Sequence, residues 1–109
     1  MRISVKLSEW EAISAGRQKY ITMPVTTQWE LRLGQHFGAV YEDGRLLQGE
    51  DLPEFMRKDP EQEVDIYGGW LKNAKHLRAV CRLHAKEHRF FVEIVRILEV
   101  LPGGKGRKE

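Results

Sequence analysis

Two segments of the chain alternate between apolar and polar residues, which is the pattern of a β-strand with one buried face. In residues 2–7 the apolar positions are Ile3, Val5 and Leu7. In residues 76–86 apolar positions alternate with basic or polar ones, and only Val80 breaks the alternation. A helix over residues 70–85 is the competing interpretation, because a second apolar set also fits a helical stripe: Trp70, Ala74, Leu77 and Cys81.

The last third of the chain predicts a second long strand. Residues 90–101 are dense in Val, Ile and Phe, so we expect a strand that is largely buried on both faces. The connection at residues 86–89 is short and polar, which predicts an antiparallel hairpin. Residues 102–109 begin with proline and are basic and rich in glycine, so we expect a flexible tail there.

A short helix is predicted at residues 8–15. Ser8 is a suitable N-cap, and Glu11 three residues later would complete a capping box. Trp10 and Ile13 share one face of this helix and are candidate core residues. Gly16 stands where a left-handed residue commonly ends a helix.

The middle of the chain predicts shorter elements. In order, they are a strand at residues 19–23 ended by Pro24, a loop at 26–28, a strand at 36–41 followed by the Asp43-Gly44 turn, a helix capped by Asp51, and a strand at 64–67. The second helix would bury an apolar stripe formed by Leu52, Phe55 and Met56.

Together these elements predict an α+β fold. The pattern gives about six mainly antiparallel strands and only two short helices. A parallel α/β sheet would need more helices than this. We therefore expect a small, partly closed β-barrel with a helix packed against it, forming a single domain over residues 1–101.

Composition narrows the location and the chemistry. The one cysteine, Cys81, cannot form an internal disulfide, and the first residues lack the apolar run of a signal peptide. We therefore expect a cytoplasmic protein that does not enter a membrane. The sequence contains no glycine-rich phosphate loop, nucleophile elbow or paired CxxC motif, so we expect no cofactor. We expect no metal either, because only a helix would gather Cys81, His84 and His88 on one face.

Charge is unevenly distributed although the net charge is only +2. Residues 41–67 contain nine acids and three bases, whereas residues 72–89 contain six bases, one acid and three histidines. On a strand, one face would carry His76, Arg78, Arg82, His84 and Lys86. Such a face suits the phosphates of a nucleic acid. An ordinary solvated surface is the alternative interpretation.

One stretch of the chain resembles a known family. The segments Ser8-Glu9-Trp10-Glu11-Ala12-Ile13-Ser14-Ala15-Gly16-Arg17 and Arg32-Leu33-Gly34-Gln35 look like the ASCH domains of the PUA-like superfamily, over about residues 3–41. The resemblance implies a small β-barrel that handles RNA or modified nucleosides. Some members hydrolyse the amide of an acetylated cytidine with a lysine, a threonine and a glutamate. Lys19 and Thr22 would take the first two parts if the strand shifts by one residue, and no glutamate is assigned.

Three functional hypotheses follow. The first is an RNA- or nucleotide-binding module in which Arg17, Lys19 and Tyr20 line a cleft beside the first helix and Arg78 and Arg82 extend the basic surface. The second is a small amidohydrolase for a modified nucleoside, using Lys19 and Thr22. The third is a protein-interaction or regulatory module that uses a sheet edge and the acidic face. The lack of a catalytic motif favours binding over catalysis.

Overall fold

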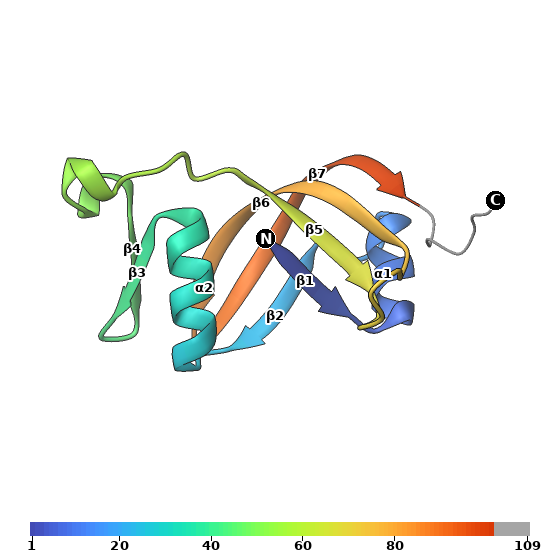
Figure 1. Ribbon diagram of the computed structural model, residues 1–109. Helices are drawn as coiled ribbons and strands as arrows, with labels where there is room; N and C mark the ends of the chain where they lie inside the picture. The colour runs from blue at the N-terminus through green and yellow to red at the C-terminus, as the bar shows by residue number, and fades with distance from the viewer. Residues whose placement is uncertain (102–109) are drawn as a thin grey trace. The chain divides into compact units, whose positions relative to one another are not determined.

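The computed structural model describes residues 1–101, and the predicted tail at residues 102–109 lies outside these described residues. Figure 1 labels the helices and strands along the chain. In order, they are β1 (Arg2–Val5), α1 (Leu7–Ser14), β2 (Tyr20–Pro24), α2 (Thr27–Phe37), β3 (Ala39–Glu42), β4 (Arg45–Gln48), the 3₁₀ turns η1 (Gly49–Asp51) and η2 (Glu54–Met56), β5 (Gln62–Gly68), β6 (His76–Lys86) and β7 (Arg89–Leu101).

Within the described part of the chain, the α+β class is confirmed. Five strands form a sheet in the order β1-β5-β6-β7-β2, and β3 pairs with β4 in a separate hairpin. The strands number seven instead of about six, and β1 runs parallel to β5. No helix in residues 1–101 is long and apolar enough to cross a membrane.

The chain forms two compact units, which are described separately. In the first unit (residues 1–19, 63–80 and 94–101), Trp10 and Ile13 of α1 are buried, as the sequence predicted. The indole nitrogen of Trp10 donates to the Ile66 carbonyl oxygen at 3.0 Å. Gly68 permits this packing, because a Cβ there would lie 3.0 Å from Cγ of Trp10. The contact therefore holds α1 against β5.

The start of α1 differs from the prediction. β1 ends at Val5, the helix begins at Leu7, and its N-cap, Lys6, makes no side-chain capping bond. Ser8 lies inside the first turn, so the predicted capping box with Glu11 is wrong. Leu7 is 46% exposed and is not part of the core. The predicted end is correct, since Gly16 has a φ of +80°.

In the second unit (residues 20–62 and 81–93), α2 replaces the predicted loop at residues 26–28 and the start of the predicted strand. Oγ1 of Thr26 accepts from the backbone N–H of Trp29 at 3.2 Å and caps the helix. Leu33 and Phe37, four residues apart, bury its apolar face. Gly38 ends the helix in the left-handed conformation, so the strand begins only at residue 39.

The Asp43-Gly44 turn is confirmed as the connection between β3 and β4. Both residues have positive φ, 52° and 77°, as a two-residue hairpin turn requires. The segment after β4 differs from its prediction, because two three-residue 3₁₀ turns replace the helix capped by Asp51. Leu52 is buried, but Phe55 is 88% exposed, so the predicted apolar stripe is wrong.

The strand interpretation of residues 76–86 is confirmed and the helical alternative is wrong. Leu77, Ala79, Cys81 and Leu83 point into the core along β6, and Trp70 is exposed. β7 alternates through the buried residues Phe90, Val92 and Ile94, and then carries exposed apolar residues. The expected burial of β7 on both faces is therefore wrong for its second half.

Replacing Gly34 with alanine should lower the free energy of unfolding. An added Cβ would lie 2.6 Å from the carbonyl oxygen of Ala39 in β3. Alanine in place of glycine normally stabilises a helix by up to about 1 kcal/mol, but the forced backbone shift costs about 1–3 kcal/mol. Urea unfolding measures the change. Gln35→Ala, at the next and exposed position of α2, is the matched control and should stay within about 0.5 kcal/mol. A higher stability for Gly34→Ala would contradict the close approach of α2 to β3.

Candidate functional site

The open face of β2, β7 and β6 in the second unit brings together side chains that are far apart in the sequence. β2 pairs antiparallel with β7, with Tyr20 opposite Glu93 and Thr22 opposite Phe91. The turn between β6 and β7 contains only Glu87 and His88. A two-residue hairpin turn places Lys86 beside Arg89 and His84 beside Phe91. Alternate residues of the three strands therefore share one face.

This face contains a groove of about 580 Å³, a volume in the range of small-molecule sites. We call it the aromatic groove, and its lining residues are Tyr20, Thr22, His84, Ala85, Lys86, Phe91 and Glu93. The Tyr20 side chain is 50% exposed, and Phe91 is half-buried. An exposed aromatic ring on a strand surface is a platform on which a planar group can stack.

A histidine–carboxylate pair lies within the aromatic groove. Nε2 of His84 is 2.7 Å from Oε1 of Glu93. The Tyr20 ring meets the His84 ring edge-on, with 6.5 Å between centroids. These contacts hold a hydrogen-bonding group beside the exposed ring of Tyr20. A ligand with both a flat face and a polar edge would match this arrangement.

A polar hollow adjoins the aromatic groove and shares His84 and Ala85 with it. Arg45 and Gln48 of β4 line this hollow. The side-chain nitrogen of Gln48 donates to the Leu83 carbonyl oxygen at 3.2 Å. Its Oε1 atom is buried and has no hydrogen-bond partner among the described residues. Buried acceptors are almost always satisfied, so this oxygen is an exception among the described residues.

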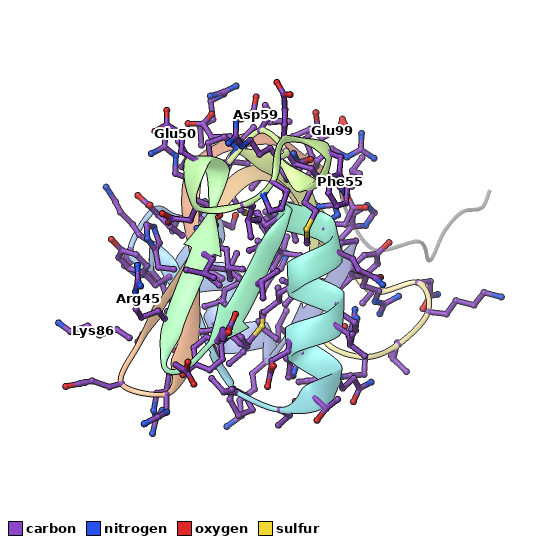
Figure 2. The ribbon with its side chains drawn as sticks, turned by 90° about the vertical axis from the view of Figure 1, so that its left-hand side faces the viewer. Arg45, Glu50, Phe55, Asp59, Lys86 and Glu99 are labelled. Carbon is purple, nitrogen blue, oxygen red and sulfur yellow. The ribbon has the colours of Figure 1, made fainter. Side chains whose placement is uncertain are left out.

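Three exposed cations stand near these two hollows. Lys86 lines the aromatic groove, Arg45 lines the polar hollow, and Arg89 lies beside Lys86 across the turn. Figure 2 shows Arg45 and Lys86 extending on the same side of the molecule. None of the three forms an ion pair with another residue in the range 1–101. Their charges are therefore available to an anion.

Arg78 and Arg82, the two arginines expected to extend the basic surface, are paired with carboxylates. Nε of Arg78 is 3.1 Å from Oδ1 of Asp65, and hydrogen bonding and charge from that carboxylate raise the pKa of Arg78. Arg82 is 2.8 Å from Oε2 of Glu61. A phosphate would have to displace these carboxylates, so a row of bases in the sequence is not a free basic surface here.

The remaining predicted site residues divide into two groups. Tyr20 and Thr22 both line the aromatic groove. Arg17 and Lys19 are exposed, precede β2 and lie outside the groove. The sequence prediction also missed Phe91 and Glu93, which hydrophobic density alone assigned to a buried strand. Their pairing with Thr22 and Tyr20 becomes evident only once the register of β2 and β7 is known.

The groove places Thr22 and His84 on strands that are not neighbours. β7 lies between β2 and β6, so the backbones at Thr22 and His84 are separated by two strand spacings, about 9.5 Å. That distance prevents a direct hydrogen bond from the Thr22 hydroxyl to the imidazole. Lys19, the other residue of the amidohydrolase hypothesis, is not in the groove.

Metal binding finds no site in the described part of the chain. Across residues 1–101, no group of three or more His, Cys, Asp and Glu side chains is placed to hold an ion. Cys81 points into the core while His84 is exposed, as the alternation of a strand requires.

Comparisons with protein-family models, with curated proteins and with solved structures find no match. Function is therefore inferred from the geometry of the aromatic groove.

Cys81 should make stability depend on pH in the alkaline range. Burial, with a smaller contribution from the charge of Glu93, raises the pKa of the Cys81 thiol to about 12. The unfolded thiol loses its proton near pH 8.5, so above that pH the unfolded state gains stability while the folded state keeps its proton. We expect the free energy of unfolding to fall by about 1–2 kcal/mol between about pH 8.5 and pH 10 from this group alone.

Urea unfolding of the wild type and of Cys81→Ala across this pH range isolates the effect. Cys81→Ala should be less stable than the wild type at every pH, because the smaller side chain leaves a cavity in the core. Its free energy of unfolding should nevertheless lack the Cys81 contribution to the dependence on pH. Equal slopes for the two proteins would contradict the buried, protonated thiol.

Proposed function

We propose that this protein is an RNA- or nucleotide-binding module whose ligand occupies the aromatic groove. The observation that carries the proposal is the combination, in one open groove, of the exposed Tyr20 ring, the adjacent His84–Glu93 pair and Lys86, which makes no ion pair within residues 1–101. Each part matches one part of a nucleotide. The ring suits a base, the pair suits the polar edge of the base, and the cation suits a phosphate.

The base would stack on Tyr20 beside Phe91. Every nucleobase has a flat π-face, so stacking gives affinity without strong sequence preference. His84 and Glu93 would then meet the edge of the base, where an acceptor oxygen of Glu93 favours a base with an exocyclic amino group. Thr22, on the same face, adds a hydroxyl for the ribose or the base.

The phosphates would lie toward Lys86, Arg89 and Arg45. These cations make no ion pairs within residues 1–101, so binding requires no carboxylate to be displaced. Contacts of this kind supply affinity that falls with added salt. The proposal therefore moves the phosphate site from Arg17, Lys19, Arg78 and Arg82 to the end of the β6–β7 hairpin.

The same proposal includes the finer fold. A PUA-like, partly closed barrel of the ASCH type is supported by the order of β1, α1 with its buried Trp10, the left-handed Gly16, and β2. The parallel pairing of β1 with β5 supplies a mixed sheet for such a fold. A cytoplasmic location, where RNA and nucleotides are abundant, is the setting we propose for it.

Tyr20→Ala should weaken RNA binding. The loss of a stacking ring costs about 1–3 kcal/mol per base, which is roughly a 5- to 150-fold rise in Kd. Fluorescence anisotropy with short labelled single-stranded RNAs of each base composition measures it. Trp70→Ala removes an aromatic side chain that is 68% exposed and lies outside the groove, and it is the matched control. Equal losses for both variants, or no binding by the wild type, would refute the site.

Lys86→Ala and Arg89→Ala should each reduce the salt dependence of binding. One lost phosphate contact lowers the slope of log Kd against log salt by about 0.7 for a single strand. Arg78→Ala removes a paired arginine and should leave the slope unchanged. If Arg78→Ala lowered the salt slope and Lys86→Ala did not, the phosphate site would lie at the residues first expected from the sequence and not at the hairpin end.

A further inference from the structure

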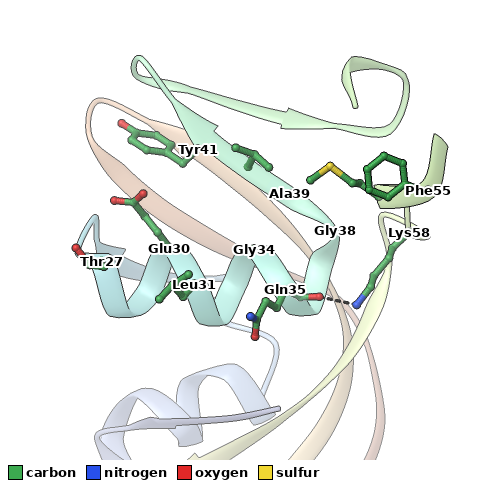
Figure 3. Close-up of a pocket in the computed structure, with 12 residues that line it drawn as sticks. Thr27, Glu30, Leu31, Gly34, Gln35, Gly38, Ala39, Tyr41, Phe55 and Lys58 are labelled. Atoms are coloured by element: carbon green, nitrogen blue, oxygen red, sulfur yellow. Dashed lines mark hydrogen bonds between the residues drawn. The ribbon is translucent and has the colours of Figure 1, made fainter. Parts of the chain in front are cut away.

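A second groove, here called the apolar groove, lies in the same unit between α2 and the segments that follow it, and Figure 3 shows it in close-up. Its volume is about 550 Å³. The residues that matter for the argument are Glu30, Leu31, Val40, Phe55, Met56 and Lys58. It shares no lining residue with the aromatic groove.

One stripe of α2 forms a wall of the apolar groove. Thr27, Glu30, Leu31, Gly34, Gln35 and Gly38 all line it, at helical steps of one, three and four residues. This stripe is distinct from the face that buries Leu33 and Phe37. The helix is about 16 Å long, which is enough to accommodate two to three turns of a partner helix.

The apolar side chains at this groove are unusually exposed. Phe55 is 88% exposed, Leu31 is 59% exposed and Met56 is 37% exposed. Exposed apolar residues that gather around a hollow are typical of protein-interaction sites. Phenylalanine and methionine are also enriched in interface cores.

The segment that carries Phe55 and Met56 is fixed on both sides by hydrogen bonds. Nε of Arg57 donates to the Leu52 carbonyl oxygen at 2.9 Å, and Nζ of Lys58 donates to the Gln35 carbonyl oxygen of α2, the dashed line in Figure 3. Gly38 leaves room for Lys58, because a Cβ there would lie 2.7 Å from Cβ of Lys58. The backbone beside Phe55 is therefore tied to α2 through Lys58, which lowers the part of the entropic cost of binding that comes from ordering this segment.

The charge around the apolar groove selects the partner. The Glu30 carboxylate points toward Tyr41 in the groove and makes no ion pair within residues 1–101. Three more acids, all of them exposed and without an ion pair to another described residue, precede Phe55, namely Glu50, Asp51 and Glu54. Figure 2 shows Glu50, Asp59 and Phe55 toward the same end of this unit. Arg57 and Lys58 donate to backbone carbonyl oxygens and keep their positive charges, so the four acids outnumber the two nearby cations.

We infer that the apolar groove binds a basic, amphipathic peptide segment of a partner protein. Its apolar side chains would pack between Leu31, Phe55 and Met56, and a lysine or arginine would pair with Glu30. The same acids repel nucleic acid, so this surface is separate from the proposed nucleotide site.

A pair of labelled model peptides tests the inference. One has leucines at helical spacing and lysines elsewhere, and the other has glutamates in place of the lysines. Anisotropy should show binding of the basic peptide to the 109-residue chain and at least about tenfold weaker binding of the acidic one. Phe55→Ser should raise the Kd of the basic peptide by about tenfold or more. Glu30→Lys should reduce the preference for the basic peptide.

Controls keep this test independent of the nucleotide site. Tyr20→Ala should leave peptide binding unchanged, and Phe55→Ser should leave RNA binding unchanged. Phe55 is exposed, so Phe55→Ser should also retain the wild-type Tm. The inference would be overturned if the two peptides bound equally well, or if Phe55→Ser left the binding of the basic peptide unchanged. Dimers in sedimentation that disappear in Phe55→Ser would also overturn it and assign the groove to a second copy of the chain.

Discussion

The turn at Glu87 and His88 determines which side chains reach the open face of the second unit. Both residues are left-handed, with φ of 54° and 61°, although neither is glycine. That conformation costs roughly 1–2 kcal/mol per residue, and the backbone pairing of two strands of 11 and 13 residues offsets it. A shift of the β7 register by one residue would turn Phe91 and Glu93 into the core and bring Phe90 and Val92 to the surface. The aromatic groove therefore depends on this short connection more than on any single side chain in it.

Charge in this protein is organised by pairing across strands. Arg78 and Arg82 alternate along β6 as a basic stripe, but Asp65 and Glu61 neutralise them from the β5 side. Exposed pairs of this kind contribute about 0–1 kcal/mol each to stability, so their main effect is on the surface potential. At the hairpin end, by contrast, Lys86 and Arg89 form no ion pair with another residue of the range 1–101. On the proposed function, a phosphate would therefore meet the turn in preference to the middle of β6.

The sequence predicts those elements whose burial follows one strict period. The alternation along β6 and the helix face of Trp10 and Ile13 are of this kind, whereas the Asp43-Gly44 turn was predicted from residue types that accept a positive φ. α2 escaped prediction because Leu31 faces solvent while Leu33 and Phe37 face the core, and Gly34 weakens the helical signal. The Ala39 carbonyl oxygen lies so close to Gly34 that a Cβ would not fit there. This reason for a glycine is a contact in the folded structure, and no local sequence pattern indicates it. For the site, the stacking argument pointed to Tyr20 and the family resemblance to Thr22, but Phe91 and Glu93 needed the strand register.

The two grooves differ in charge, and the hairpin of β3 and β4 lines both the apolar groove and the polar hollow that adjoins the aromatic groove. Tyr41 of β3 lines the apolar groove, packs edge-on against Phe90 with 5.3 Å between ring centroids, and its hydroxyl lies 3.3 Å from Nδ1 of His88. His88 belongs to the turn that places Lys86 and Arg89, and β4 supplies Arg45 to the polar hollow. On the two proposals made above, a basic peptide and an anionic ligand would occupy different grooves and would not compete. Movement of Tyr41 on peptide binding would nevertheless reach the phosphate-facing turn through His88, which gives the two surfaces a physical route for coupling.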